Sequence, residues 1–526
     1  MKFKKILFIF TLVIFLIASS ILLCLPTNKN NKNSEIYNDI FNLKTAAGEG
    51  VYIAGDNHGE PDDAYSGAVE LSDGRVILAP LCSDYVGIYH TKNDTYERGA
   101  LHGEGDNAFK GGIMVNNETI IFTPWRSTHI GIYYPFNDTY ISGPPHNEGD
   151  HAFSYGALMN DGRILLPPYF SNYIGIYNFS SNTYSRGPLH GQGGLTIGAF
   201  SDACVVDNGT VILTPAGSDN IGIYYPHNNT YENGDAQSDT GVTAPAYIRA
   251  LKVDNDTLIF IPRGSNYMGV YLPETDNYFR GAAHGEVNYA FSGGILLNSG
   301  EIVLVPDELG YISLYDPETD TYTRDITHPE GSSAFYGGCL LSNGGALFAP
   351  ESSAHIGIYG QTPGEFSLSA NESTIQPNAS FLLEWSDSEI SENYSLWFEF
   401  ENGGFSPYQE TLTNHSFVFS NCSLEGRYRF FVNALNEFGS EMSNTIEVNV
   451  QTETDATTDE NTKDKQDNDG SSEINNENEG ILVWVMRYVS GGVISATTGI
   501  VIKKVHARRK QKKEKIKRSR IQKDID

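Results

Sequence analysis

Histidine and serine recur along the chain at positions that could bind a metal ion or form hydrogen bonds. Six histidines and six serines occupy repeated positions: His58, His102, His146, His190, His284 and His328, and Ser83, Ser127, Ser171, Ser218, Ser265 and Ser353. Zinc needs ligand atoms at about 2.1 Å, whereas equivalent positions in neighbouring repeats lie a whole repeat apart. We therefore expect a structural hydrogen-bond network in each repeat, with a ligand role as the alternative.

A second set of candidates stands where the repeats differ from one another. Two positions after a repeated aromatic residue, four copies have glycine, whereas three consecutive copies have Tyr155, Asp202 and Arg249. Glycine lets the backbones crowd along the central channel of a ring. We predict either a ligand site at the channel mouth, with Tyr155 stacking and Asp202 and Arg249 as charged contacts, or an Asp202–Arg249 ion pair that plugs the channel. Segments 191–198 and 235–245 are also three residues longer than their counterparts.

Signatures of enzymes are missing from the sequence. It contains no Gly-x-Ser-x-Gly elbow, His-Glu-x-x-His motif, phosphate-binding loop or sialidase-type Asp box. The His-Gly-Glu loops contain Glu60, Glu104 and Glu286. Because these glutamates recur in several copies, they resemble structural residues rather than a single catalytic acid and its base. We expect no catalytic residue, no metal and no cofactor, and we keep an exterior carbohydrate-active or oxidising enzyme as an alternative.

An internal repeat of seven copies must position all of these residues. One strand of each copy ends in tyrosine, with spacings of 44, 44, 47, 47, 44 and 44 residues: Tyr89, Tyr133, Tyr177, Tyr224, Tyr271, Tyr315 and Tyr359. Each copy holds four β-patterned runs, which in the second copy cover 108–115, 119–124, 130–134 and 139–142. Four strands in a unit of this length predict an all-β fold, a seven-bladed β-propeller over residues 48–360.

The ends of the repeat predict how the ring closes. The seventh copy stops after its third strand at Tyr359, and a spare strand, 51–54, precedes the first copy. We expect the spare strand to become the fourth strand of the last blade. Such a closure removes two exposed sheet edges.

The repeat resembles kelch and WD-type propeller repeats. The Gly-Gly pairs of the first strand, the Asp-Gly-Arg turn and Tyr-Asp-Pro-Glu-Thr-Asp-Thr-Tyr at 315–322 are kelch-like, although tyrosine replaces the kelch tryptophan. His-Gly before the first strand is similar to the WD type, whose loop histidine and serine or threonine form a structural network. The resemblance implies architecture only. A galactose oxidase-like copper enzyme needs a Tyr–Cys pair and two histidines that cannot be placed here.

Residues 364–451 are expected to form an immunoglobulin-like or fibronectin type III β-sandwich. Segments 381–385, which ends in Trp385, and 394–400 have strand patterns. The run 428–440 resembles the late strands of a fibronectin type III domain, including its buried tyrosine. Such a sandwich needs about 90–100 residues, and its usual role is that of a spacer or docking module.

The two ends of the chain predict that it is held at a membrane. Residues 1–26 combine a basic start with an apolar run, as in a signal peptide or signal anchor. Residues 480–502 contain one charge, Arg487, and are long enough for a transmembrane helix. The 12 basic residues of 503–526 predict a cytoplasmic tail that binds anionic lipid. The acidic stretch 452–479 is typical of a disordered stalk.

Charge and glycosylation motifs indicate the partners. Between the apolar runs there are 19 basic and 62 acidic residues, a formal charge of −43, which repels nucleic acid. Asn-x-Ser/Thr motifs suit an exterior glycoprotein, for example at Asn93, Asn137, Asn178, Asn228, Asn378 and Asn414. We expect a membrane-anchored cell-surface protein, single-pass if the N-terminal run is cleaved and two-pass if not. It would bind an extracellular glycan or protein, with a surface-coat component as a further alternative.

Overall fold

The computed structural model describes residues 48–452, apart from 117, 193–194, 196, 238–244 and 421. The predicted signal segment, transmembrane helix and basic tail, and all but the first residue of the predicted stalk, lie outside the described residues. Within the described part, no helix is long and apolar enough to cross a membrane. Strands dominate there, and η2 (Asp254–Asp256) is a short 3-10 turn.

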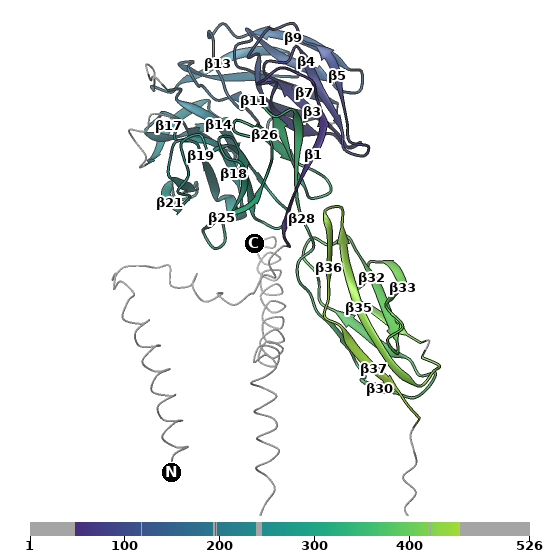
Figure 1. Ribbon diagram of the computed structural model, residues 1–526. Helices are drawn as coiled ribbons and strands as arrows, with labels where there is room; N and C mark the ends of the chain where they lie inside the picture. Colours follow the sequence, from purple (N-terminus) through teal and green to yellow (C-terminus); the bar gives the residue numbers. More distant parts are fainter. Residues whose placement is uncertain are drawn as a thin grey trace, which may run out of the picture. The chain divides into compact units, whose positions relative to one another are not determined.

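Most strands form antiparallel sheets of four consecutive strands, the blades of the repeat (Figure 1). Blade 1 contains β2 (Tyr65–Glu70), β3 (Arg75–Pro80), β4 (Tyr85–His90) and β5 (Thr95–Leu101). Blade 2 contains β6 (Phe109–Asn116), β7 (Thr119–Pro124), β8 (His129–Tyr134) and β9 (Thr139–Pro145). Blade 3 contains β10 (Ala157–Leu158), β11 (Arg163–Leu166), β12 (Tyr173–Asn178) and β13 (Thr183–Leu189).

The later blades repeat this plan. Blade 4 contains β14 (Phe200–Val205), β15 (Val211–Pro215), β16 (Asn220–Tyr225) and β17 (Thr230–Ala236). Blade 5 contains β18 (Tyr247–Lys252), β19 (Leu258–Pro262), β20 (Tyr267–Leu272) and β21 (Asn277–Ala283). Blade 6 contains β22 (Phe291–Leu296), β23 (Ile302–Pro306), β24 (Tyr311–Asp316) and β25 (Thr321–Thr327).

The last blade is built from both ends of the repeat. It contains β26 (Phe335–Leu340), β27 (Ala346–Pro350), β28 (His355–Gln361) and the N-terminal β1 (Gly50–Asn57). Strand β1 pairs antiparallel with β28, and Ile53 lies opposite Ile358. The predicted donation of strand 51–54 to the last blade is therefore observed, and the strand is longer than predicted.

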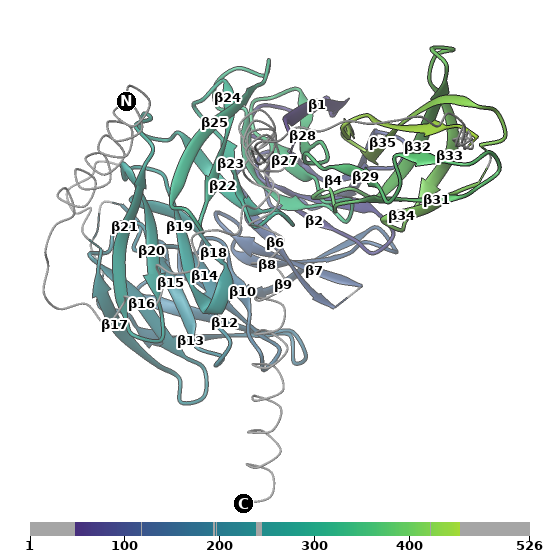
Figure 2. The ribbon, with the colours of Figure 1, turned by 90° about the horizontal axis from the view of Figure 1, so that it is seen from below.

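The first strands of the blades meet in a ring. Each contacts the next, from β2 through β6, β10, β14, β18 and β22 to β26, and β26 contacts β2 again. Figure 2 shows β10, β14 and β18 beside one another near the middle of this ring. The described residues therefore show a β-propeller-like fold with four-stranded antiparallel blades, as the repeat predicts.

Burial explains why these sequences form stacked blades. The second strand of blade 2, β7, is buried at every residue, whereas its outer strand β9 is mostly exposed. Strands with a continuous apolar sequence therefore lie between blades. Alternation of apolar and polar residues is confined to the outer strands. Sheets that pack face to face leave about 10 Å between them, which large side chains such as Phe122 and Tyr133, both fully buried, fill.

A side-chain hydrogen bond fixes the turn between the third and fourth strands. The Tyr133 hydroxyl donates to Asp138 Oδ1 at 2.9 Å, and this oxygen also accepts the Ala100 N–H of the preceding blade at 2.7 Å. Asp138 has φ 45°, a left-handed conformation that aspartate and asparagine tolerate in turns. The marker tyrosines repeat this bond in Tyr89–Asp94, Tyr177–Asn182, Tyr224–Asn229, Tyr271–Asp276 and Tyr315–Asp320.

The residues after the propeller form two further sheets. One contains β29 (Leu368–Ala370), β31 (Phe381–Trp385) and β34 (Ser416–Phe419). The other contains β30 (Thr374–Ile375), β37 (Ile446–Val450), β35 (Gly426–Asn436), β32 (Asn393–Phe400) and β33 (Ser406–Leu412), with β36 (Gly439–Met442) on β35. Trp385 and Tyr428 are buried in one apolar core that both sheets share.

We predict that the ring depends on β1 for cooperative folding. A fragment that begins at residue 61 should lose its sharp unfolding transition in urea, because blade 7 keeps an unpaired edge and loses its tie to the N-terminus. A synthetic peptide of residues 48–60 should restore the transition, since it binds only the folded state.

The control for this experiment is the same peptide with Ile53→Pro, which interrupts the strand and should not restore the transition. A fragment that unfolds at the same urea concentration with and without the peptide would contradict the closure argument.

Candidate functional site

The repeated histidines and serines lie at the junctions between blades. In blade 1, His102 Nε2 is 2.7 Å from the Ser83 carbonyl oxygen, and equivalent bonds run from His58 to Ser353, His146 to Ser127, His190 to Ser171 and His284 to Ser265. His328 bonds to the Leu309 carbonyl, because blade 6 has Leu309 where the others have serine. Each histidine therefore fastens the segment that leaves a blade to that same blade.

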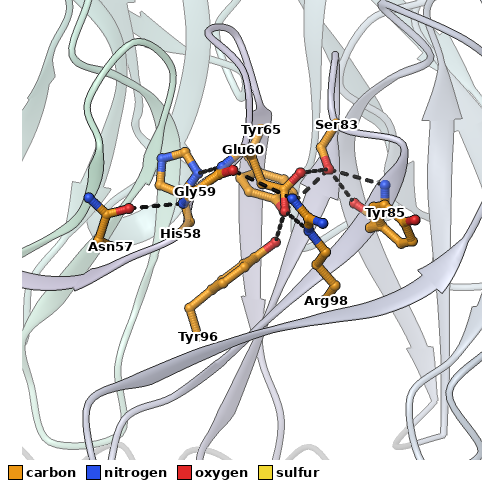
Figure 3. Close-up of polar contacts among 9 residues, drawn as sticks. All are labelled: Asn57, His58, Gly59, Glu60, Tyr65, Ser83, Tyr85, Tyr96 and Arg98. Carbon is orange, nitrogen blue, oxygen red and sulfur yellow. Dashed lines mark hydrogen bonds and ion pairs between the residues drawn. The ribbon is translucent and has the colours of Figure 1, made fainter.

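The residue two positions after the histidine reaches into the next blade. Glu60 follows His58, and its carboxylate accepts bonds from Ser83 Oγ at 3.1 Å and the Tyr96 hydroxyl at 3.0 Å (Figure 3). It also forms an ion pair with Arg98. Glu104, Glu148, Glu286 and Glu330 make related contacts with the blades that follow them. Histidine and glutamate together clamp neighbouring blades to each other.

Hydrogen bonds fix the protonation state of these histidines. The Glu60 N–H donates to His58 Nδ1 at 3.2 Å, so Nε2 carries the proton that bonds to Ser353. Burial lowers the pKa of His58, His146, His190, His284 and His328 below the ordinary value of 6.5. In blade 4, which lacks the histidine, Gln237 Nε2 donates to the Ser218 carbonyl at 3.2 Å.

The three predicted ligand residues come together at the ring axis. The Arg249 guanidinium lies over the Tyr155 ring, 3.9 Å from its centroid, and Arg249 Nε is 3.7 Å from Asp202 Oδ2. The Tyr155 hydroxyl donates to the Ser66 carbonyl of blade 1 at 3.0 Å. Burial raises the pKa of Asp202 to about 6, while Arg249 and the Ala250 N–H act in the opposite direction.

The space beside these residues is too small for an organic ligand. Tyr155 is 3% exposed and Asp202 5%. The neighbouring cavity, lined by Tyr155, Arg249 and glycines such as Gly67 and Gly111, has a volume of about 50 Å³. Ligand pockets measure roughly 300–1,000 Å³, whereas 50 Å³ holds only water. This geometry favours the plug over the ligand site as the role of Tyr155, Asp202 and Arg249.

A cluster of charged and aromatic residues lies beside the plug, at one mouth of the channel. We define the mouth cluster as Lys110, Trp125, Arg263, Asp307, Tyr336 and Glu351. Lys110 and Tyr336 are the second residues of first strands, and the other four residues directly follow second strands. Antiparallel pairing therefore brings all six to the same edge of the blades. Tyr336 stacks on Tyr155 with the ring centroids 6.5 Å apart, which connects the cluster to the plug.

Cations contact aromatic rings throughout the mouth cluster. Lys110 Nζ lies 4.3 Å from the Trp125 ring and 4.4 Å from the Tyr336 ring, and it donates to the Tyr336 hydroxyl at 2.6 Å. The Arg263 guanidinium lies 5.2 Å from the same Tyr336 ring and forms a 2.9 Å ion pair with Asp307. In contacts of this kind the ring face attracts the cation electrostatically.

The carboxyl groups of the cluster are held in an unusual state. Burial and the negative charge of Asp307 raise the pKa of Glu351 to about 8, against the opposing effects of Arg263 and Lys110. Among the described residues, Glu351 Oε2 has no hydrogen-bond partner. Burial also raises the pKa of Asp307, while Arg263 lowers it. Groups perturbed in this way gather at functional sites.

An aromatic patch adjoins the cluster. It consists of Trp125, His151, Tyr169 and Phe170: the Trp125 ring lies 4.6 Å from His151 and 4.9 Å from Tyr169, and Tyr169 lies 4.9 Å from Phe170. Phe170 is 45% exposed, and the other three are half-buried. Apolar surface rimmed by charges marks interaction sites.

Most residues of this mouth are not among the predicted site residues, although the repeat contains the signal. The position after the marker proline reads Leu81, Trp125, Tyr169, Ala216, Arg263, Asp307 and Glu351 around the ring. The position after the aromatic marker is serine in four blades and Lys110, Ile248 and Tyr336 in the others. Comparison of these two positions between blades identifies the residues of the mouth.

Comparison with known proteins shows the fold alone. No family model and no curated protein matches the sequence. A streptogramin B lyase structure has 14% identity and a TM-score of 0.51 over 60% of this chain and 98% of its own. The virginiamycin B lyase from Staphylococcus aureus has 13% identity and a TM-score of 0.50 over 59% and 99%. The extracellular domain of a hybrid two-component system from B. thetaiotaomicron has 11% identity and a TM-score of 0.49 over 78% and 60%.

We predict that the buried histidines make a contribution to the stability of the propeller that is lost in mild acid. The unfolded chain binds more protons than the folded one wherever a buried histidine has a lowered pKa, so stability should fall as the pH drops from 7 through 6.5 toward 5. Each kcal/mol lost lowers the melting temperature by roughly 2–4 °C. Calorimetry of the wild type and His146→Gln, which imitates Gln237, checks this, because the variant should lose less stability on acidification. The same pH dependence of the melting temperature in the wild type and the variant would refute the clamp.

We predict that Arg249→Ala costs about 2–4 kcal/mol of unfolding free energy at neutral pH, because Asp202 keeps a buried charge without its partner. The cost should be smaller at pH 5, where Asp202 is protonated. Arg126→Ala is the control: its pair with Asp150 is exposed and 3.8 Å long, and removing it should cost less than about 1 kcal/mol. Equal costs for both variants in urea titrations would show that Arg249 is no plug.

Proposed function

We propose that this chain is a membrane-anchored cell-surface protein that binds an extracellular glycan or protein through the mouth of a seven-bladed propeller. The mouth cluster and the aromatic patch carry this proposal. Tryptophan, tyrosine and arginine, which dominate the energetics of binding surfaces, gather there where the repeat itself requires none of them. Each inward-facing cation is held against rings, so the surface is preorganised for a ligand.

The path of the chain supports this role. Strand β1 runs from Gly50, opposite Gln361, to Asn57, next to the His58–Ser353 bond at the mouth edge. Its 8 residues, at about 3.3 Å each, place the two edges of the blade roughly 25 Å apart. The chain therefore enters and leaves the ring at the edge away from the mouth. In this proposal the chain leads from the ring toward the anchor at residue 361, at the edge opposite the mouth.

The glycosylation motifs agree with this arrangement. Asn93, Asn137 and Asn228 occupy turns between third and fourth strands, at the edge opposite the mouth. Glycans there would leave the mouth uncovered. In this proposal residues 364–451 are a fibronectin type III-like spacer, 452–479 a stalk and 480–502 the membrane anchor, followed by a basic tail that contacts anionic lipid.

An exterior carbohydrate-active enzyme is a second candidate. A carboxyl whose pKa is about 8, such as that of Glu351 near Arg263 and Lys110, is suited to donating a proton at neutral pH. No second catalytic group is identified among the described residues, so binding without turnover is the stronger proposal. Release of product from a bound glycan, lost in Glu351→Gln, would support the enzyme instead.

We predict that Trp125→Ala weakens ligand binding without unfolding the ring. The full-length chain in mild detergent would be screened against a glycan array and against extracellular proteins. Loss of a central tryptophan should weaken binding by about 30-fold, or 2 kcal/mol. Phe279→Ala removes a 50% exposed aromatic of the outer strand β21 and should leave binding intact. A ligand that both variants bind equally would place the site elsewhere, and absence of any ligand would favour the surface-coat alternative.

A further inference from the structure

Lys110 has a charge that the protein leaves unbalanced. Its ammonium group donates to the Tyr336 hydroxyl and lies over two rings. Across residues 48–452, apart from those not described, no carboxylate lies within 4.0 Å of it. An ammonium has three donors, and only one has a partner here. The side chain is half-buried at the mouth, so the other two donors are placed for a ligand.

The neighbouring groups leave the mouth cluster with a net positive charge. Arg263 and Asp307 balance each other in their 2.9 Å ion pair. Glu351, whose pKa is raised, is neutral below about pH 8. Lys110 is therefore the remaining charge, and it stands in a segment of formal charge −43. A cation without an ion-pair partner in an acidic protein attracts a ligand's anionic group to one place.

We infer that the mouth cluster binds an acidic saccharide, whose carboxylate contacts Lys110 Nζ while its ring packs against the aromatic patch. This inference rests on the proposed function and gives its ligand a chemical class. Trp125 belongs to both surfaces, so the charge contact and the aromatic patch are next to each other. The C–H bonds of a sugar face carry partial positive charge, which the negative face of an aromatic ring attracts.

A single carboxylate fits better than a phosphate or sulfate ester. Sites for those groups usually offer several cations or a bidentate arginine fork. Here one point charge is available, and the nearby Arg263 is already paired with Asp307. The strong negative field of the ectodomain also opposes ligands with many charges.

A sugar fits better than the C-terminus of a peptide. Peptide carboxylates are generally held by a nest of free backbone N–H groups, and extended peptides add to an open strand edge. The first strand of blade 2, β6, pairs with β7, and the Gly111 N–H already lies 3.3 Å from Ser66 Oγ. The mouth offers side chains, and aromatic side chains suit a sugar ring.

The ionisation of Glu351 makes binding depend on pH. The charged groups that act on it are Asp307, Arg263, Asp63 and Lys110. A bound anion opposes ionisation of Glu351, so the neutral form binds more tightly. Affinity should therefore fall as the pH rises from 6.5 to 9, and a cationic ligand would show the opposite trend. Glu351→Gln, which stays neutral, should keep the affinity of the low-pH form at every pH.

The test compares sugars that differ only in whether they have a carboxyl group. Short oligomers of glucuronate and galacturonate would be titrated against the full-length chain in mild detergent, each beside its carboxyl-reduced counterpart. We expect the acidic member to bind roughly 10- to 100-fold more tightly, the range for a hydrogen bond to a charged group. Lys110→Met should remove the difference. Lys92→Met, which changes an exposed lysine in the turn between β4 and β5, should not.

Each other outcome overturns the inference. Equal affinity for the acidic and reduced sugars, lost in Trp125→Ala, would leave the proposed function standing and refute the acidic ligand. Preference for a sulfated sugar or a peptide carboxylate over both uronates would also refute it. The comparison of acid with reduced sugar uses the wild-type protein, so it remains decisive even if Lys110→Met fails to fold.

Discussion

The first strands of all the blades converge on one axis, where there is space for little more than backbone. At Gly111, whose φ is 72°, a Cβ would lie 2.6 Å from the Tyr155 ring. Tyr155 can therefore occupy this level only because Gly111 of the preceding blade has no side chain. Tyr155 takes that space, Arg249 covers its ring, and Asp202 balances the arginine. This crowding closes the axis at the level of Tyr155 and leaves a cavity of only about 50 Å³ beside it.

Two sets of hydrogen bonds then hold the blades at fixed angles. At the mouth edge, histidine bonds back to its own blade while glutamate reaches the next one, as His102 and Glu104 do. At the opposite edge, a turn carboxylate such as that of Asp138 accepts bonds from two blades. The loops of the mouth therefore start from a rigid frame. Their side chains can vary without loss of the fold, because the repeated residues, and not the variable ones, carry these bonds.

The fold could be predicted because its marker residues recur in seven copies of the repeat, whereas each residue of the mouth cluster occurs in one copy only. Marker residues such as Tyr133 and Pro124 gave the period, the strand number and the donation of β1. The meeting of Tyr155, Asp202 and Arg249 could also be predicted, since equivalent positions face one axis. Whether they bind a ligand or fill space depends on a volume of about 50 Å³, which spacing does not encode. Lys110 and Glu351 become neighbours only through the curvature of the ring.

The closing pair of strands also determines how the ring responds to force. Gly50 and Gln361 lie opposite each other at the start of the β1–β28 ladder, so both chain exits belong to the same end of the same pair. Tension applied between these exits would separate the strands one hydrogen bond at a time, as in a zipper, rather than shear all bonds together. A propeller retained by both of its ends would be mechanically weak. If the propeller were pulled only through residue 361, the force would pass along the covalently connected blades. Strands β1 and β28 would then stay paired.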